Sequence, residues 1–140
     1  MKTSDFMTFG AAAVAAETSL AIAARRLLNY RIGSLPVVDS SGRMVGIISE
    51  TDIVRQLASS RLLASIINQD PAVRLEQLNA VEVAAVMSSR VTVVDAEAPL
   101  QEAIELMATE GLHHLPVIKD GKLRGMLSGA DVLRALIDAD

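Results

Sequence analysis

The stretch "GIISETDIV" at residues 46–54 returns almost unchanged as "GMLSGADVL" at residues 125–133. In both copies a glycine and two apolar residues lead to a serine, and an aspartate follows three positions later. A short apolar run followed by serine and aspartate is typical of a strand that turns directly into a helix. The chain therefore uses the same junction twice, with hydroxyl and carboxylate groups gathered at each copy.

The repeat extends far beyond these two stretches. A shift of 80 residues, reduced to 79 after one deletion in a turn, aligns fifteen identical residues. The two repeats span about residues 5–59 and 85–138, and a linker at 60–84 joins them. The linker pattern predicts helices with a break at Asp70-Pro71.

Each repeat predicts the order β-α-β-β-α, most clearly in the second. Residues 91–95 alternate like a strand, and residues 99–111 carry an apolar face at helical spacing between Pro99 and Gly111. Two apolar segments joined by "KDGK" predict a hairpin, and "ADVLRALI" predicts a last helix. A unit this small buries its sheet poorly alone, so the sequence favours a mixed α/β fold of two units packed together.

Composition excludes several classes of function. The chain has 140 residues, a net charge of −4 and no cysteine, so disulfides, thiolate catalysis and cysteine-based metal sites are excluded. The aromatic content of 2% and the lack of a basic stripe argue against nucleic acid as a partner. No apolar run approaches the roughly 20 residues of a membrane span, and a cytoplasmic protein is expected.

The first 17 residues have the outline of a short signal peptide: a lysine, an apolar run and Ala-x-Ala. Against this interpretation, Asp5 lies in the region that should be basic, and the run is mostly alanine. The repeat also includes this segment. We therefore expect it to be part of the fold.

Two motifs, each present twice, resemble a known family. The segments "SLPVVD" and "HLPVI" precede the two junctions at matching distances. Together they resemble a tandem pair of cystathionine-β-synthase (CBS) domains, the arrangement called a Bateman module. The resemblance implies two β-α-β-β-α units packed about a pseudo-two-fold axis. It also implies a homodimer that binds AMP, ADP, ATP or S-adenosylmethionine between the units and regulates a separate partner protein.

The resemblance implies a first nucleotide cleft that draws on both repeats. Asp52 would accept hydrogen bonds from ribose hydroxyls, whereas the simpler alternative is that this residue and its serine only cap a helix. The resemblance places histidines at the phosphate end, and anions are expected to bind there more tightly at mildly acid pH. The residues expected in this cleft are Ile47, Ser49, Thr51, Asp52, His113, His114 and Pro116.

A second cleft is expected to bind more weakly. Ala130 stands where the first copy has Thr51, and Gly33-Ser34 stand where the other copy has two histidines. The residues expected there are Thr18, Ser34, Pro36, Met126, Ser128 and Asp131.

Three alternatives to nucleotide sensing are considered from the residues. A ligand-free dimerisation or assembly module is the main alternative, because the apolar helix residues serve either the core or an interface, with the core favoured for most of them. These residues are Leu27, Leu28, Ile104, Met107, Leu133 and Leu136. No catalytic spacing is present, so an enzyme is not expected. A metal site is not expected either, because neighbouring residues of a strand point to opposite faces and no third ligand is evident.

Overall fold

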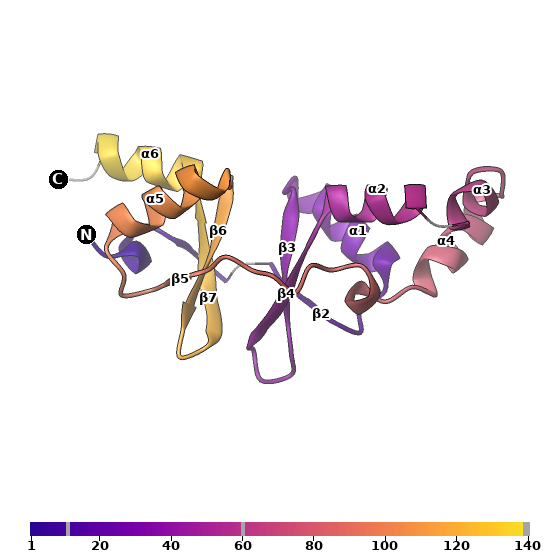
Figure 1. The fold of residues 1–140 in the computed structure, drawn as a ribbon, viewed down its shortest axis with the longest axis horizontal. Helices are drawn as coiled ribbons and strands as arrows, with labels where there is room; N and C mark the ends of the chain where they lie inside the picture. Colours follow the sequence, from indigo (N-terminus) through magenta and orange to yellow (C-terminus); the bar gives the residue numbers. More distant parts are fainter. Residues whose placement is uncertain (11, 60, 139–140) are drawn as a thin grey trace. The chain divides into compact units, whose positions relative to one another are not determined.

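The computed structural model describes residues 1–10, 12–59 and 61–138, which form two compact units (Figure 1). The C-terminal unit contains Met1–Ala12, Ser41–Met44 and Thr92–Asp140. The N-terminal unit contains Ala13–Ser40 and Val45–Val91. The element order within them confirms the predicted β-α-β-β-α repeat.

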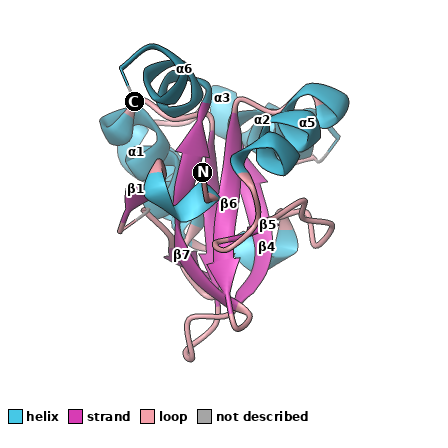
Figure 2. Ribbon diagram, turned by 90° about the vertical axis from the view of Figure 1, so that its left-hand side faces the viewer, coloured by secondary structure: helices cyan, strands magenta, loops and turns pink. Residues whose placement is uncertain are grey.

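The C-terminal unit is built around a four-stranded sheet (Figure 2). The strand order is β1-β7-β6-β5, in which β6 runs parallel to β5 and antiparallel to β7. The elements are η1 (Thr3–Asp5), β1 (Thr8–Phe9), β5 (Val94–Asp95), α5 (Leu100–Glu110), β6 (His114–Lys119), β7 (Lys122–Ser128) and α6 (Gly129–Asp138). The strand expected at residues 91–95 is thus confined to its last two residues.

The N-terminal unit has a three-stranded sheet of order β2-β3-β4. Its elements are β2 (Val14–Ala15), α1 (Leu20–Tyr30), β3 (Ser34–Val38), β4 (Met44–Ser49), α2 (Glu50–Ser59), α3 (Leu62–Ile67), α4 (Pro71–Asn79) and η2 (Val83–Ala85). Helix α4 has Asp70 at its N-cap and Pro71 in its first turn, where the missing N–H costs no hydrogen bond. The Ser19 hydroxyl, which also caps α1, donates to the side-chain oxygen of Asn79 at 2.9 Å, so α4 is tied to α1.

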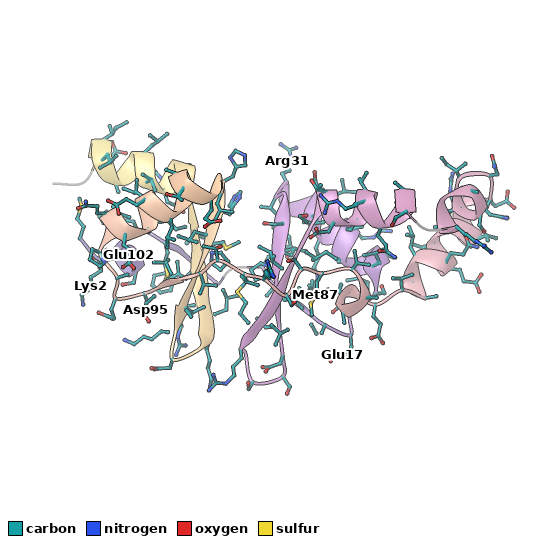
Figure 3. All side chains as sticks on the ribbon, viewed as in Figure 1. Lys2, Glu17, Arg31, Met87, Asp95 and Glu102 are labelled. Atoms are coloured by element: carbon teal, nitrogen blue, oxygen red, sulfur yellow. The ribbon has the colours of Figure 1, made fainter. Side chains whose placement is uncertain are left out.

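Local backbone geometry explains where several elements of the two units end. Helix α5 stops at Gly111, whose φ of 64° is left-handed. The hairpin between β6 and β7 turns at Asp120 and Gly121, with φ of 54° and 78°. Two consecutive left-handed residues are what a tight two-residue hairpin turn requires, and Asp-Gly is a favoured pair for it. Arg31 takes the left-handed position at the end of α1 without being glycine, with its side chain projecting outward (Figure 3).

Each unit is completed by a segment at the start of the other repeat. In the C-terminal unit, Thr3 N–H donates to the carbonyl of Ala98 at 2.8 Å. In the N-terminal unit, Val83 N–H donates to the carbonyl of Thr18 at 2.8 Å, and these four residues are equivalent in the repeat. Residues 1–9, the N-terminal segment, therefore belong to the unit of the second repeat, and residues 81–88, the linker segment, to the unit of the first.

A glycine lets each segment cross the sheet closely. In the C-terminal unit, β1 pairs with β7 through Thr8 opposite Met126 and Phe9 opposite Gly125. A Cβ atom added at Gly125 would lie 2.5 Å from the carbonyl oxygen of Thr8. In the N-terminal unit, a Cβ atom at Gly46 would lie 2.6 Å from the sulfur of Met87, which lies close to β4 (Figure 3). The glycine that opens each repeated motif thus has a packing role.

The cores are aliphatic, as the composition predicts. In the C-terminal unit, Met7 of the N-terminal segment packs with residues of all the main elements. The buried members of this core are Met7, Val94, Ala96, Leu100, Ala103, Met107, Leu115, Val117, Leu127 and Ala135.

The expectation that most of the apolar helix residues serve the core is only partly correct. Leu27 and Met107 are buried, and Ile104 is half-buried. Leu28, Leu133 and Leu136 are instead 74%, 60% and 61% exposed. Their side chains lie on helix faces that the chain itself leaves uncovered.

An ion-pair cluster fastens the N-terminal segment to its unit. Lys2 Nζ lies 2.9 Å from one carboxylate oxygen of Glu97, and Lys119 Nζ lies 3.1 Å from the other. The hydrogen bond from Lys2, followed by that from Lys119, lowers the pKa of Glu97, and the same contact with Glu97 raises the pKa of Lys2. The equivalent Glu17 makes no ion pair with any residue in the described part of the chain.

The close crossing at Gly125 predicts a loss of stability in the variant Gly125→Ala. The new methyl group meets main chain that cannot move aside freely, so the free energy of unfolding should fall by about 1–3 kcal/mol. Urea unfolding followed by circular dichroism measures this change. Gly33→Ala is the matched control, because a Cβ atom there has no neighbour within 4 Å. Equal stability of the two variants would contradict the packing role.

The cluster around Glu97 predicts a pH-dependent attachment of the N-terminal segment. Because the pKa of Glu97 is lowered in the folded state, its stabilising contribution is present above about pH 4.3 and is lost as the pH falls further. The raised pKa of Lys2 adds stability that is lost only in strong alkali. In Glu97→Gln the melting temperature should therefore depend less on pH across the acid range, whereas Glu17→Gln should keep the wild-type profile. Identical acid profiles for Glu97→Gln and the wild type would refute the idea.

Candidate functional site

The repeated Ser-x-x-Asp motif forms a reciprocal cap at the start of α2. Asp52 N–H donates to the hydroxyl oxygen of Ser49 at 3.0 Å, and Ser49 N–H donates to a carboxylate oxygen of Asp52 at 3.0 Å. Two N–H groups that the helix leaves unpaired are satisfied in this way. The capping interpretation of the motif is therefore correct for the structure, and binding of a ligand would have to use what the cap leaves free.

The second copy repeats this geometry at the start of α6. Asp131 N–H donates to the hydroxyl oxygen of Ser128 at 3.1 Å, and Ser128 N–H donates to a carboxylate oxygen of Asp131 at 2.8 Å. The cap thus tolerates Gly129 and Ala130 between its two members. The two residues between the serine and the aspartate differ between the copies without changing the cap. Their differences therefore alter only the surface around the cap.

The two aspartates differ in their second carboxylate oxygen. In the second copy that oxygen of Asp131 accepts a hydrogen bond from Arg134 at 2.7 Å, and the side chain is only 7% exposed. In the first copy the equivalent Arg55 lies 3.5 Å from Asp52, whose side chain is 18% exposed. Asp52 therefore keeps an acceptor that is more open to an incoming hydroxyl group.

Both main-chain groups of Ile47, two residues before Ser49, are already hydrogen-bonded. Ile47 N–H donates to Ser88 at 2.9 Å, and the Ile47 carbonyl accepts from Ser88 N–H at 2.8 Å. The backbone of Ile47 is thus paired with the linker segment, which leaves its half-buried side chain for contact with a flat ring. Met126, its equivalent, pairs with Thr8 in the same manner.

The histidines lie beside the motif of their own unit. His114 opens β6 and pairs with Ser128 of β7, and the exposed His113 accepts a hydrogen bond from Gly129 N–H at 3.2 Å through its carbonyl. Pro116, two residues further along β6, is buried. Ser49 and Asp52 belong to the N-terminal unit, so their pairing with these residues across the two units remains a prediction from the family resemblance.

The remaining residues predicted for the second cleft have local structural roles. The hydroxyl oxygen of Thr18 accepts from Ala15 N–H at 3.1 Å and holds the turn between β2 and α1. Ser34 opens β3 half-buried, and Pro36 is buried. These three lie in the N-terminal unit, whereas Ser128 and Asp131 lie in the C-terminal unit.

The described residues contain no group of three or more His, Asp or Glu side chains arranged to hold a metal ion. None of the described helices combines the length and the apolar character that a membrane crossing demands.

The two segments that lie against the motifs are not predicted by the sequence pattern. Thr8 and Ser88 pair with the strand residue that follows the motif glycine in each unit. The identity of Met7 with Met87 in the repeat was the available signal, because it placed one such segment ahead of each motif at nearly the same distance. That spacing did not reveal which repeat each segment would join.

Comparisons with known proteins agree with the fold and the repeat. The profile of the CBS domain family matches residues 4–59 and 83–138. An uncharacterized 17.7 kDa protein of Acidianus ambivalens is 34% identical over 138 residues, covering 98% of this chain and 74% of that protein. A CBS domain-containing protein of Dictyostelium discoideum is 34% identical over 122 residues, covering 86% of this chain and 81% of its own length.

Among solved structures, CBSX2 in complex with AMP superposes with a TM-score of 0.77 at 28% identity, covering 98% of this chain and 96% of that one. A chain of 140 residues with two β-α-β-β-α repeats, both matched by one family profile, belongs to the CBS domain family and carries two copies of its domain.

Proposed function

We propose that this chain is a regulatory module that binds an adenosine-type ligand, with Asp52 as the main ribose-binding group. The observation that carries this proposal is the second carboxylate oxygen of Asp52, which Arg55 approaches only to 3.5 Å, on a side chain that is more exposed than that of Asp131. The complex of CBSX2 with AMP supports the class of ligand, and proteins of two CBS domains are typically regulatory.

The chemistry of a ribose suits the groups that the cap leaves free. A ribose has two neighbouring hydroxyl groups, and a carboxylate oxygen accepts such hydrogen bonds at about 1.5–3 kcal/mol each. The exposed Thr51 adds a hydroxyl one residue before Asp52, and Ser49 still has its own proton to donate. The half-buried side chain of Ile47 would contact the base.

The phosphate end of the proposed site follows from the family resemblance. His113, His114 and Pro116 are assigned to it, as the histidines are the basic groups next to the Leu-Pro sequence. AMP, ADP, ATP and S-adenosylmethionine are the candidate ligands. A second site around Ser128 and Asp131 would be weaker, because Arg134 already occupies the outer oxygen of that carboxylate.

Regulation would act on a separate partner protein. A ligand shifts a conformational equilibrium only by the difference between its affinities for the two states. The ligand would therefore need to favour one arrangement of the module, and the partner would need to distinguish that arrangement.

The variant Asp52→Asn separates the two roles of this residue. An asparagine side-chain oxygen can still accept from Ser49 N–H and preserve the cap, but its amide group donates where the carboxylate would accept from ribose. Isothermal titration with AMP, ATP and S-adenosylmethionine should show binding by the wild type and at least a tenfold weaker affinity in Asp52→Asn. Asp131→Asn is the matched control, and its first-site affinity should equal that of the wild type. Lack of any heat with all three compounds at millimolar concentration would end the proposal.

The exposed apolar residues support a second candidate function, that of an assembly module without a ligand. Leu28 of α1 is 74% exposed, and Leu133, Leu136 and Ile137 lie on one face of α6 with 60%, 61% and 77% exposure. Large apolar side chains gathered on one face often mark an interface with another chain. Self-association that no adenosine ligand alters would favour this function over sensing.

A further inference from the structure

The side chain of Met87 packs against Gly46, where the linker segment crosses β4. A Cβ atom added at Gly46 would meet the Met87 sulfur at 2.6 Å, the carbonyl oxygen of Ser88 at 2.8 Å and the Met87 Cγ at 3.2 Å. The thioether therefore lies directly against main chain, beside β4 (Figure 3). A methionine suits such a narrow and irregular space because its side chain is unbranched and polarizable.

Met7 makes the equivalent contact in the C-terminal unit, but it is less open to solvent. Its sulfur would lie 2.9 Å from a Cβ atom added at Gly125. Met7 is only 8% exposed, whereas Met87 is half-buried. The two methionines thus have the same packing role, and a reagent dissolved in water reaches Met87 more readily.

The contact at Gly46 adjoins the hydrogen bonds that join the linker segment to β4. Ile47 N–H donates to the Ser88 carbonyl at 2.9 Å, and Ser88 N–H donates to the Ile47 carbonyl at 2.8 Å. These two residues form an isolated bridge rather than part of a longer ladder. Because Ser88 directly follows Met87 in the chain, a displacement of the Met87 side chain pulls on this bridge.

We propose that Met87 is an oxidation site, at which a hydroperoxide converts the thioether to a sulfoxide and thereby opens the bridge between Ser88 and Ile47. The sulfur donates an electron pair to one peroxide oxygen, so an S–O bond forms as the O–O bond breaks. The proton of the transferred oxygen passes to the second oxygen, which leaves as water when the oxidant is hydrogen peroxide. The sulfur is oxidised and the peroxide is reduced.

The product does not fit the space that the thioether occupies. A sulfoxide is larger than a thioether and carries a polar, partly negative oxygen. The Ser88 carbonyl oxygen, which is also partly negative, borders the same point above Gly46. Steric crowding and this repulsion both favour movement of residues 87 and 88 away from β4.

Opening of the bridge affects the strand that leads into the first cap. Both main-chain groups of Ile47 lose their partners, two residues before Ser49. Methionine sulfoxide reductases return a sulfoxide to the thioether, so the change is reversible. This inference concerns the sheet of the N-terminal unit and does not depend on binding of an adenosine ligand.

Treatment of the full chain with hydrogen peroxide tests the proposal. Peptide mass spectrometry should show that Met87 gains one oxygen atom at least tenfold faster than Met7. Amide hydrogen exchange, measured by NMR, reports local opening of hydrogen bonds. Exchange of the Ile47 and Ser88 amides should become at least tenfold faster after oxidation and should return to the initial rate after treatment with the reductases.

Matched variants assign the effect to one sulfur. Met87→Leu keeps an apolar side chain of similar volume that cannot be oxidised, so peroxide should leave its Ile47 and Ser88 exchange rates unchanged. Met1→Leu removes the most exposed of the six methionines, at 62%, and its response to peroxide should equal that of the wild type. Circular dichroism spectra before treatment show whether both variants are folded.

Three results would overturn the proposal. The first is oxidation of Met87 no faster than that of Met7. The second is oxidation of Met87 without faster exchange of the Ile47 and Ser88 amides. The third is an equal response to peroxide in Met87→Leu, because another methionine would then be responsible.

Discussion

The close crossing of a main-chain segment over a strand glycine is the constraint on which both units depend. At Gly125 the carbonyl of Thr8 occupies the space that any side chain would need, and at Gly46 Met87 and Ser88 do the same. Only because these positions lack a Cβ atom can the segments pair with the sheet and carry Met7 and Val83 into buried positions. The turn into the helix follows three residues later in both units, so the crossing and the cap are parts of one local arrangement.

Much of the architecture could be predicted from the sequence because local patterns determine it. The period of the apolar residues, Pro99 before α5, Gly111 after it and Asp120-Gly121 in the hairpin each have a direct backbone reason. The repeat made these patterns more reliable, because a feature weak in one copy was clear in the other. The exchange of the two segments could not be predicted, since it depends on contacts between residues far apart in the sequence, such as Thr3 with Ala98.

The candidate site shows a different limit of prediction. Serine and aspartate at this spacing satisfy a helix cap and also suit a ribose, and the sequence alone cannot separate the two uses. The structure contains the cap in both copies, and it reveals a difference that the residue types conceal. Arg55 and Arg134 are the same residue at the same place, yet they approach their aspartates at 3.5 Å and 2.7 Å. The availability of a carboxylate depends on such side-chain placement rather than on the motif.

The exchanged segments have a consequence for how such a chain arises and how it can be divided. Cutting between the repeats would leave each half with the segment that completes its former neighbour and without the one that completes itself. In a protein with a single repeat, the same arrangement would complete each sheet only if two molecules exchanged their N-terminal segments. When two repeats are joined in one chain, this exchange becomes intramolecular. The segment that completes each unit is then present at high effective concentration.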